Sequence, residues 1–98
     1  MHRDAVIAVL RAHKDALRRQ GVARAALFGS TARGDAAAGS DLDIMIEVDP
    51  AAQVDLYGYA GITRYIADLF PVPVDVAEHG RLVDPVRQTA ERDAIYAF

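Results

Sequence analysis

Three aspartates in this chain occupy positions that are typical of metal ligands. Asp41 and Asp43 lie two residues apart at the start of an alternating apolar run, and Asp75 lies between Val74 and Val76. Residues two apart in a strand project to the same face, so Asp41 and Asp43 should lie close together. Like charges at that distance repel each other unless a cation lies between them. Carboxylates on a rigid strand suit Mg²⁺, which proteins commonly hold together with substrate phosphates.

A possible phosphate site precedes the aspartates. Ten residues separate Gly29-Ser30 from Asp41. Glycine lets the backbone approach a phosphate, and a serine at the start of a helical turn offers a hydroxyl and N–H groups to an anion. A Gly-Ser dipeptide alone is usually only a turn, so its distance from the aspartates carries the interpretation. If Asp75 joins Asp41 and Asp43, three carboxylates could hold two Mg²⁺ ions, as nucleotidyl transfer requires.

The periodicity of the apolar residues predicts the elements that position these side chains. The expected order is helix, strand, strand, helix, strand, helix, which indicates an α/β or α+β fold. The predicted helices span residues 5–20, 55–70 and 85–96, and the predicted strands span residues 22–28, 42–48 and 73–77. Residues 31–39 are predicted as a loop with room for one helical turn. Asp84 is predicted to cap the last helix, with Pro85 in its first turn.

Length, composition and charge narrow the class of protein. The chain has 98 residues, 52% of them apolar, and no cysteine, which favours one domain over residues 1–98 and excludes a thiolate metal site. Six of the 11 basic residues but only two of the 14 acidic residues precede residue 25. The acidic remainder disfavours contact with a long nucleic acid. The charged N-terminal segment and the lack of a long apolar run predict a soluble cytoplasmic protein with no membrane partner.

The spacing of the two motifs resembles a known signature. Gly29-Ser30, ten intervening residues and Asp41-Leu42-Asp43 match the GS-x10-DxD pattern of the DNA polymerase beta-like nucleotidyltransferase superfamily. The wider sequence FGSTARGDAAAGSDLDIMIE, followed later by VDVAE, is similar to the minimal nucleotidyltransferase branch of that superfamily. The resemblance implies a small mixed β-sheet flanked by helices, Mg²⁺ as cofactor and ATP or another nucleoside triphosphate as donor.

The resemblance also implies a role for each site residue. Asp41, Asp43 and Asp75 would be the catalytic and metal-binding residues, and Asp75 could assist deprotonation of the acceptor. Gly29 and Ser30 would contact the triphosphate. For Arg33, nucleotide binding through a phosphate and a structural ion pair both remain open. Glu47 shares the strand parity of the aspartates but lies about 13 Å beyond Asp43 at the usual rise per residue, which favours a surface position.

The acceptor and partner are also implied only by the resemblance. Members this short resemble antitoxins whose partner is a toxin of the HEPN ribonuclease class, and these antitoxins transfer AMP from ATP to a tyrosine of the toxin. Larger relatives that modify antibiotics usually have an added helical domain to bind the drug. A protein adenylyltransferase that assembles with its toxin is therefore the leading hypothesis. Two alternatives remain open: an antitoxin that neutralises its partner by occlusion without catalysis, and a nucleotidyltransferase acting on a small molecule.

Overall fold

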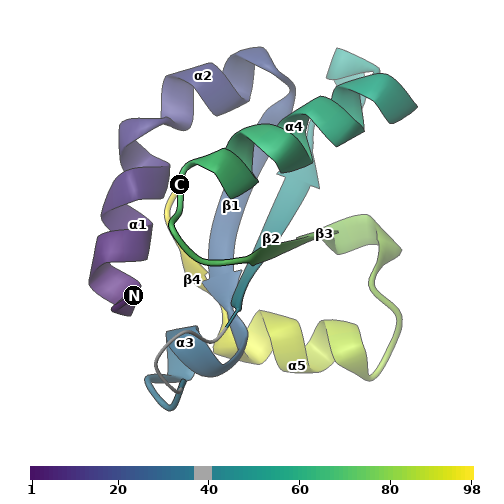
Figure 1. The fold of residues 1–98 in the computed structure, drawn as a ribbon. Helices are drawn as coiled ribbons and strands as arrows, with labels where there is room; N and C mark the ends of the chain where they lie inside the picture. Colours follow the sequence, from purple (N-terminus) through teal and green to yellow (C-terminus); the bar gives the residue numbers. More distant parts are fainter. Residues whose placement is uncertain (37–40) are drawn as a thin grey trace.

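The fold is built on a four-stranded mixed β-sheet. In the computed structural model, which describes residues 1–36 and 41–98, the strand order is β3-β2-β1-β4 (Figure 1). β1 is antiparallel to both β2 and β4, whereas β2 and β3 are parallel. The strands are β1 (Val22–Phe28), β2 (Leu42–Val48), β3 (Val74–Glu78) and β4 (Ile95–Tyr96). The predicted α/β fold with a small mixed sheet is therefore confirmed.

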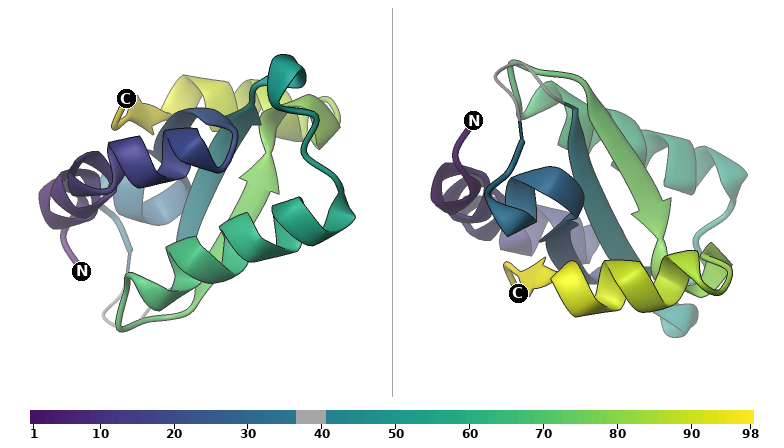
Figure 2. Two further views of the ribbon diagram at one scale, coloured as in Figure 1. Left: turned by 90° about the horizontal axis from the view of Figure 1, so that it is seen from above. Right: turned by 90° about the horizontal axis from the view of Figure 1, so that it is seen from below.

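Helices cover the two faces of the sheet unequally. Figure 2 shows α1, α2 and α4 on one side of the sheet and α5 on the other. The α-helices are α1 (Arg3–Ala12), α2 (Lys14–Arg19), α3 (Gly29–Arg33), α4 (Leu56–Asp68) and α5 (Val86–Asp93). Two short 3₁₀ helices, η1 (Pro50–Ala52) and η2 (His79–Arg81), follow β2 and β3. None of the helices within residues 1–36 and 41–98 is long and apolar enough to cross a membrane.

The alternation along β2 decides which side chains enter the main core. Leu42, Ile44 and Ile46 are fully buried among residues of α1, α2 and α4. Because successive side chains of a strand point to opposite faces, Asp43 and Met45 lie on the α5 face. Met45 packs there in a smaller cluster with Ala26 and Ala90. The sequence pattern predicted this division of β2 correctly.

Both terminal helices differ from their predicted bounds. The helix predicted over residues 5–20 is wrong as one element, because it is interrupted at His13, which packs edge-on against Tyr65. The interruption still leaves both Leu10 and Leu17 fully buried in the main core.

The last helix ends at Asp93, not at Tyr96, because residues 95–96 pair with β1 as strand β4. This pairing covers the edge of β1 and depends on long-range contacts.

The predicted cap of the last helix is also wrong. Asp84 does not cap α5; the residue at the N-cap is Pro85, which makes no side-chain cap hydrogen bond. The Asp84 carboxylate instead pairs with Arg87, at 3.4 Å. The N-cap of α4 is Asp55, whose carboxylate accepts a hydrogen bond from the Gly58 N–H at 2.7 Å.

Candidate active site

Two of the predicted aspartates face each other across adjacent strands. Asp43 is the second residue of β2, Asp75 is the second residue of β3, and the two are register partners in the parallel pair. Neighbouring strands lie about 4.8 Å apart, and register partners share a face, so both carboxylates project from the α5 face. Asp43 is half-buried and Asp75 is exposed. The sequence left open whether Asp75 joins the other aspartates, and the pairing of β2 with β3 places it beside Asp43.

Asp41 lies immediately before β2 and is exposed. Burial raises the pKa of Asp43, and the negative charges of Asp75 and Asp41 raise it further, whereas the positive charge of Arg33 lowers it. The charges of Asp41 and Asp75 therefore both act on the Asp43 carboxylate. A cation placed there would relieve their repulsion, and their hard oxygen atoms fit Mg²⁺.

The aspartates form an open set and not a closed metal cage. Within the part of the chain that the structure describes, no three His, Cys, Asp or Glu side chains form a group that could hold a metal ion by themselves. Mg²⁺ usually keeps several water ligands and takes others from substrate phosphates. An ion at these aspartates would therefore need further ligands from water or from a bound molecule.

Gly29 lies directly against Asp43. β1 ends at Phe28, and α3 begins with Gly29 and Ser30, so the Gly-Ser pair lies at the turn from strand to helix. Gly29 has a φ of +74°, which disfavours residues with a side chain. A Cβ at this position would overlap Asp43 Oδ2 and lie 3.2 Å from Asp43 Cγ. Glycine therefore lets the backbone pass this carboxylate without strain and without displacing it, which brings the two sequence motifs together.

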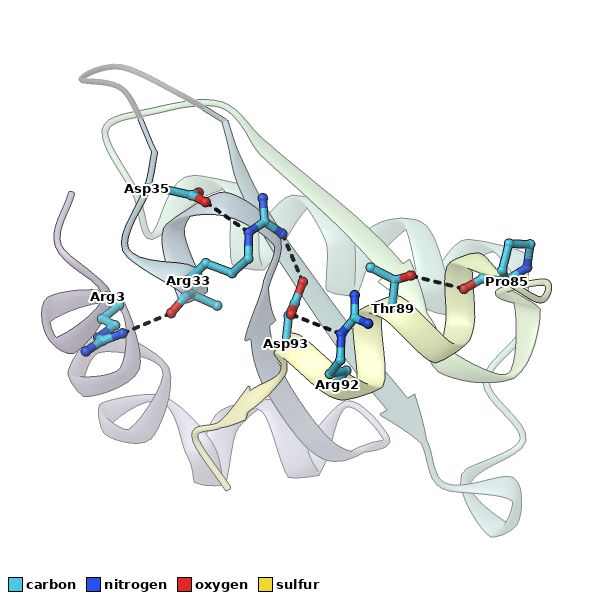
Figure 3. A network of polar contacts seen from close by, with 8 residues as sticks. Arg3, Arg33, Asp35, Pro85, Thr89, Arg92 and Asp93 are labelled. Carbon is cyan, nitrogen blue, oxygen red and sulfur yellow. Dashed lines mark hydrogen bonds and ion pairs between the residues drawn. The ribbon is translucent and has the colours of Figure 1, made fainter.

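Arg33, the last residue of α3, joins that helix to α5 (Figure 3). Its Nη1 donates to Asp93 Oδ2 at 2.9 Å, and its Nε donates to Asp35 Oδ2 at 3.2 Å. The hydrogen bond to Asp93, followed by that to Asp35, raises the pKa of Arg33. Of the two roles left open for this residue, the structural ion pair is observed, and its charge also acts on Asp43.

Sequence reasoning missed Asp93. This residue lies at the end of α5, belongs to no motif and is 60 residues from Arg33 in the sequence. Its side chain is only 12% exposed. No local pattern distinguishes it from an ordinary surface acid, so only the packing of α5 against α3 identifies it.

Glu47 and His79 lie outside this set of residues. The Glu47 carboxylate accepts a hydrogen bond from the Tyr96 hydroxyl at 3.2 Å and pairs with Arg24 at 3.7 Å. His79 Nε2 lies 2.6 Å from Glu91 Oε1. The Glu47 side chain is 31% exposed, which is consistent with the predicted surface position, and its two partners lie on β1 and β4.

Comparison with known proteins identifies the family. The model of the family described as "Nucleotidyltransferase domain" matches residues 10–97. The chain belongs to this family. Among the relatives of this nucleotidyltransferase is "Putative protein adenylyltransferase MJ1379" of Methanocaldococcus jannaschii, which is 34% identical over 90 residues, covering 90% of each chain. "Protein adenylyltransferase MntA" of Thermococcus cleftensis is 32% identical over 89 residues, covering 90% of this chain and 88% of its own.

Solved structures agree with this assignment. The structure of a "putative minimal nucleotidyltransferase" superposes on this nucleotidyltransferase with a TM-score of 0.70 and 30% identity, covering 97% of this chain and 95% of the other. A structure described as a toxin-antitoxin with AMP-PNP superposes with a TM-score of 0.68 and 19% identity, covering 90% of this chain and 72% of the other. At that identity, the second match supports the fold alone.

Proposed function

We propose that this nucleotidyltransferase uses Mg²⁺ to transfer AMP from ATP to a tyrosine hydroxyl of a partner toxin of the HEPN class, and so acts as an antitoxin. The observation that carries the proposal is the pairing of Asp43 with Asp75 on the α5 face, beside Gly29. The names of the relatives favour a protein as acceptor and AMP as the transferred group. The neighbour described as a toxin-antitoxin with AMP-PNP favours a toxin as partner and ATP as donor.

Asp41, Asp43 and Asp75 are the residues that would hold the metal. When bound, Mg²⁺ would neutralise charge on the triphosphate and favour the deprotonated acceptor oxygen. Gly29 and Ser30 would bind the phosphates. Gly29 lies against the Asp43 carboxylate, so phosphates at this turn would lie next to a metal ion held by Asp43. Arg33 would contribute positive charge at the same place while it remains tied to α5.

The transfer step needs a base close to the attacking oxygen. The acceptor hydroxyl oxygen forms a bond to the α-phosphorus of ATP, and the bond from that phosphorus to the bridging oxygen of the β-phosphate breaks. Pyrophosphate leaves with the electron pair of that bond, and the hydroxyl proton passes to the Asp75 carboxylate. Asp75 suits this role because it is exposed on β3, the edge strand, where a protein segment can reach it.

The experiment is a transfer assay with the product of the neighbouring gene as acceptor. The enzyme, the neighbouring protein, Mg²⁺ and ATP labelled in the α-phosphate are incubated, and the labelled peptide is sequenced by mass spectrometry. We expect AMP on a tyrosine of the partner and no transfer from ATP labelled only in the γ-phosphate. Absence of label, under conditions where the two proteins are shown to bind, would contradict the proposal. If the Asp41→Asn/Asp43→Asn variant still neutralised an unmodified partner in cells, occlusion would replace catalysis as the mechanism.

A further inference from the structure

A cavity of about 270 Å³ lies between α3 and α5. We call it the α3–α5 cavity; its lining residues are Phe28, Gly29, Arg33, Pro85, Val86, Thr89, Ala90 and Asp93. Its walls are mostly apolar. Phe28 and Ala90 belong to the small cluster on the α5 face, whereas Val86 is 52% exposed. The cavity is therefore open to solvent on one side and closed by packed residues on another.

The α3–α5 cavity adjoins the proposed phosphate site. Gly29 lines the cavity and also lies against the Asp43 carboxylate. Arg33 and Asp93 line it too, and their ion pair of 2.9 Å links the two helices there (Figure 3). A nucleotide whose phosphates lie at Gly29 and Asp43 would therefore have this cavity next to it.

The chemistry of the walls selects which part of a nucleotide can enter. Apolar side chains offer a phosphate no hydrogen-bond donors, and burial of an uncompensated charge is costly. Arg33, the cation of the lining, is already paired with the Asp93 carboxylate. A flat, uncharged group needs no such donors and carries no charge to bury, and it gains free energy by burying its apolar surface against these walls.

We propose that the α3–α5 cavity binds the nucleoside of the donor nucleotide, with its base against Val86 and Ala90. The inference rests on the proposed function for the nature of the donor. It adds a site on α5, an element that carries neither the Gly-Ser pair nor any of Asp41, Asp43 and Asp75.

Val86→Trp tests the inference, and Val83→Trp is the matched control. Both valines are exposed, but only Val86 lines the cavity. Binding of ATP and of inorganic tripolyphosphate, each with Mg²⁺, is measured by calorimetry. We expect Val86→Trp to weaken ATP binding at least tenfold and to leave tripolyphosphate binding unchanged, while Val83→Trp changes neither. Unchanged ATP binding in Val86→Trp, or an equal loss for ATP and tripolyphosphate, would overturn the inference.

Photolabelling gives a second test that needs no substitution. The wild-type enzyme is irradiated with 8-azido-ATP and Mg²⁺, digested with trypsin and sequenced by mass spectrometry. We expect the label on residues 82–87 or 88–92, the tryptic peptides that contain the α5 part of the lining. Label confined to peptides outside residues 25–33 and 82–98 would overturn the inference.

The two proposals fail in different ways. Both tests measure nucleotide binding without an acceptor, so they stand even if no partner is modified. Conversely, if the partner is modified but Val86→Trp binds ATP normally, the site on α5 is refuted and the proposed function is retained.

Discussion

The two faces of the β-sheet differ sharply, although the same strands supply both. On the face covered by α1, α2 and α4, alternate residues of β2 are fully buried in the main apolar cluster. On the α5 face, the cluster is small, and Asp43 shares the surface with the aspartate of β3. Neighbouring residues such as Asp43 and Ile44 therefore meet opposite environments. The comparison indicates that the face under α1, α2 and α4 stabilises the fold, whereas the α5 face can carry charged side chains because less of it is buried.

Removing charge from the α5 face should affect catalysis and not stability. We expect Asp43→Asn to lower the rate of transfer on the order of 10²–10³-fold, because it removes charge that stabilises the metal and the transition state. Since burial and neighbouring charges raise the pKa of Asp43, its ionised form is less favourable in the folded state than in the unfolded state. The midpoint of thermal unfolding at pH 7 without metal should therefore stay the same or rise.

Glu47→Gln is the matched control for that substitution, because Glu47 lies on the same strand and face but contacts Tyr96 and Arg24. Its transfer rate should stay close to that of the wild type. A large fall in both variants would mean that any charge lost from β2 disables the enzyme, and the assignment of Asp43 would fail.

Truncating the neighbouring residue on the core face should give the opposite result. Ile44 is fully buried, and removal of such a side chain leaves a cavity. We expect Ile44→Ala to lower the free energy of unfolding by about 2–5 kcal/mol. Chemical denaturation measures this loss, and the specific activity of the fraction that remains folded should be near normal. A loss below about 1 kcal/mol would contradict the assignment of this face as the core.

The two glycines Gly29 and Gly61 should respond oppositely to alanine. Gly29→Ala places a side chain at a φ of +74° against the Asp43 carboxylate, which should cost about 1–2 kcal/mol and displace that carboxylate. Gly61 lies within α4, and an added Cβ would have no atom within 4 Å apart from its chain neighbours and the backbone of its own helix. Gly61→Ala should therefore stabilise the protein by about 0.5–1 kcal/mol. Unfolding curves and transfer rates of both variants test this difference. A Gly29→Ala variant as stable and active as the wild type would contradict a steric role for the contact between Gly29 and the Asp43 carboxylate.

The Tyr96 hydroxyl provides a smaller, pH-dependent contribution on the α5 face. Burial, and next the charge of Glu47, raises the pKa of Tyr96, so the folded state favours its neutral form. We expect Tyr96→Phe to cost about 0.5–1.5 kcal/mol near pH 8, through loss of the hydrogen bond to Glu47. The difference should shrink as the pH rises above 10.0, the ordinary pKa of tyrosine, and through the higher folded value. Unfolding measured from pH 8 to 11 tests this; a constant difference would contradict it.

The ion pair between α3 and α5 should give the smallest effect. Asp93→Asn removes one charged partner of Arg33, and we expect the KM for ATP to rise about two- to fivefold while kcat changes little. The Asp93 side chain is 12% exposed and that of Asp35 is 61% exposed. Asp35→Asn should therefore have a weaker effect because water screens this pair. Steady-state kinetics test this prediction, and an effect of Asp35→Asn as large as that of Asp93→Asn would contradict the idea that the pair with Asp93 holds Arg33 in place.

Local patterns predicted the elements that depend on few residues. The alternation of β2 was sufficient to place Ile44 in the core and Asp43 on the other face, because the period of a strand is fixed by backbone geometry. The bounds of the terminal helices were wrong for the opposite reason. The break at His13 and strand β4 are accompanied by packing against α4 and pairing with β1, neither of which leaves a local signal.

The sequence by itself determined the kinds of groups at the candidate site and their spacing along the chain: two aspartates of equal strand parity, and a Gly-Ser pair ten residues earlier. Only the tertiary structure decided which distant groups join them. The parallel register of β2 and β3 brings Asp75 beside Asp43, and the packing of α5 brings Asp93 to Arg33. Periodicity acts over a few residues, whereas these contacts depend on how whole elements share one core.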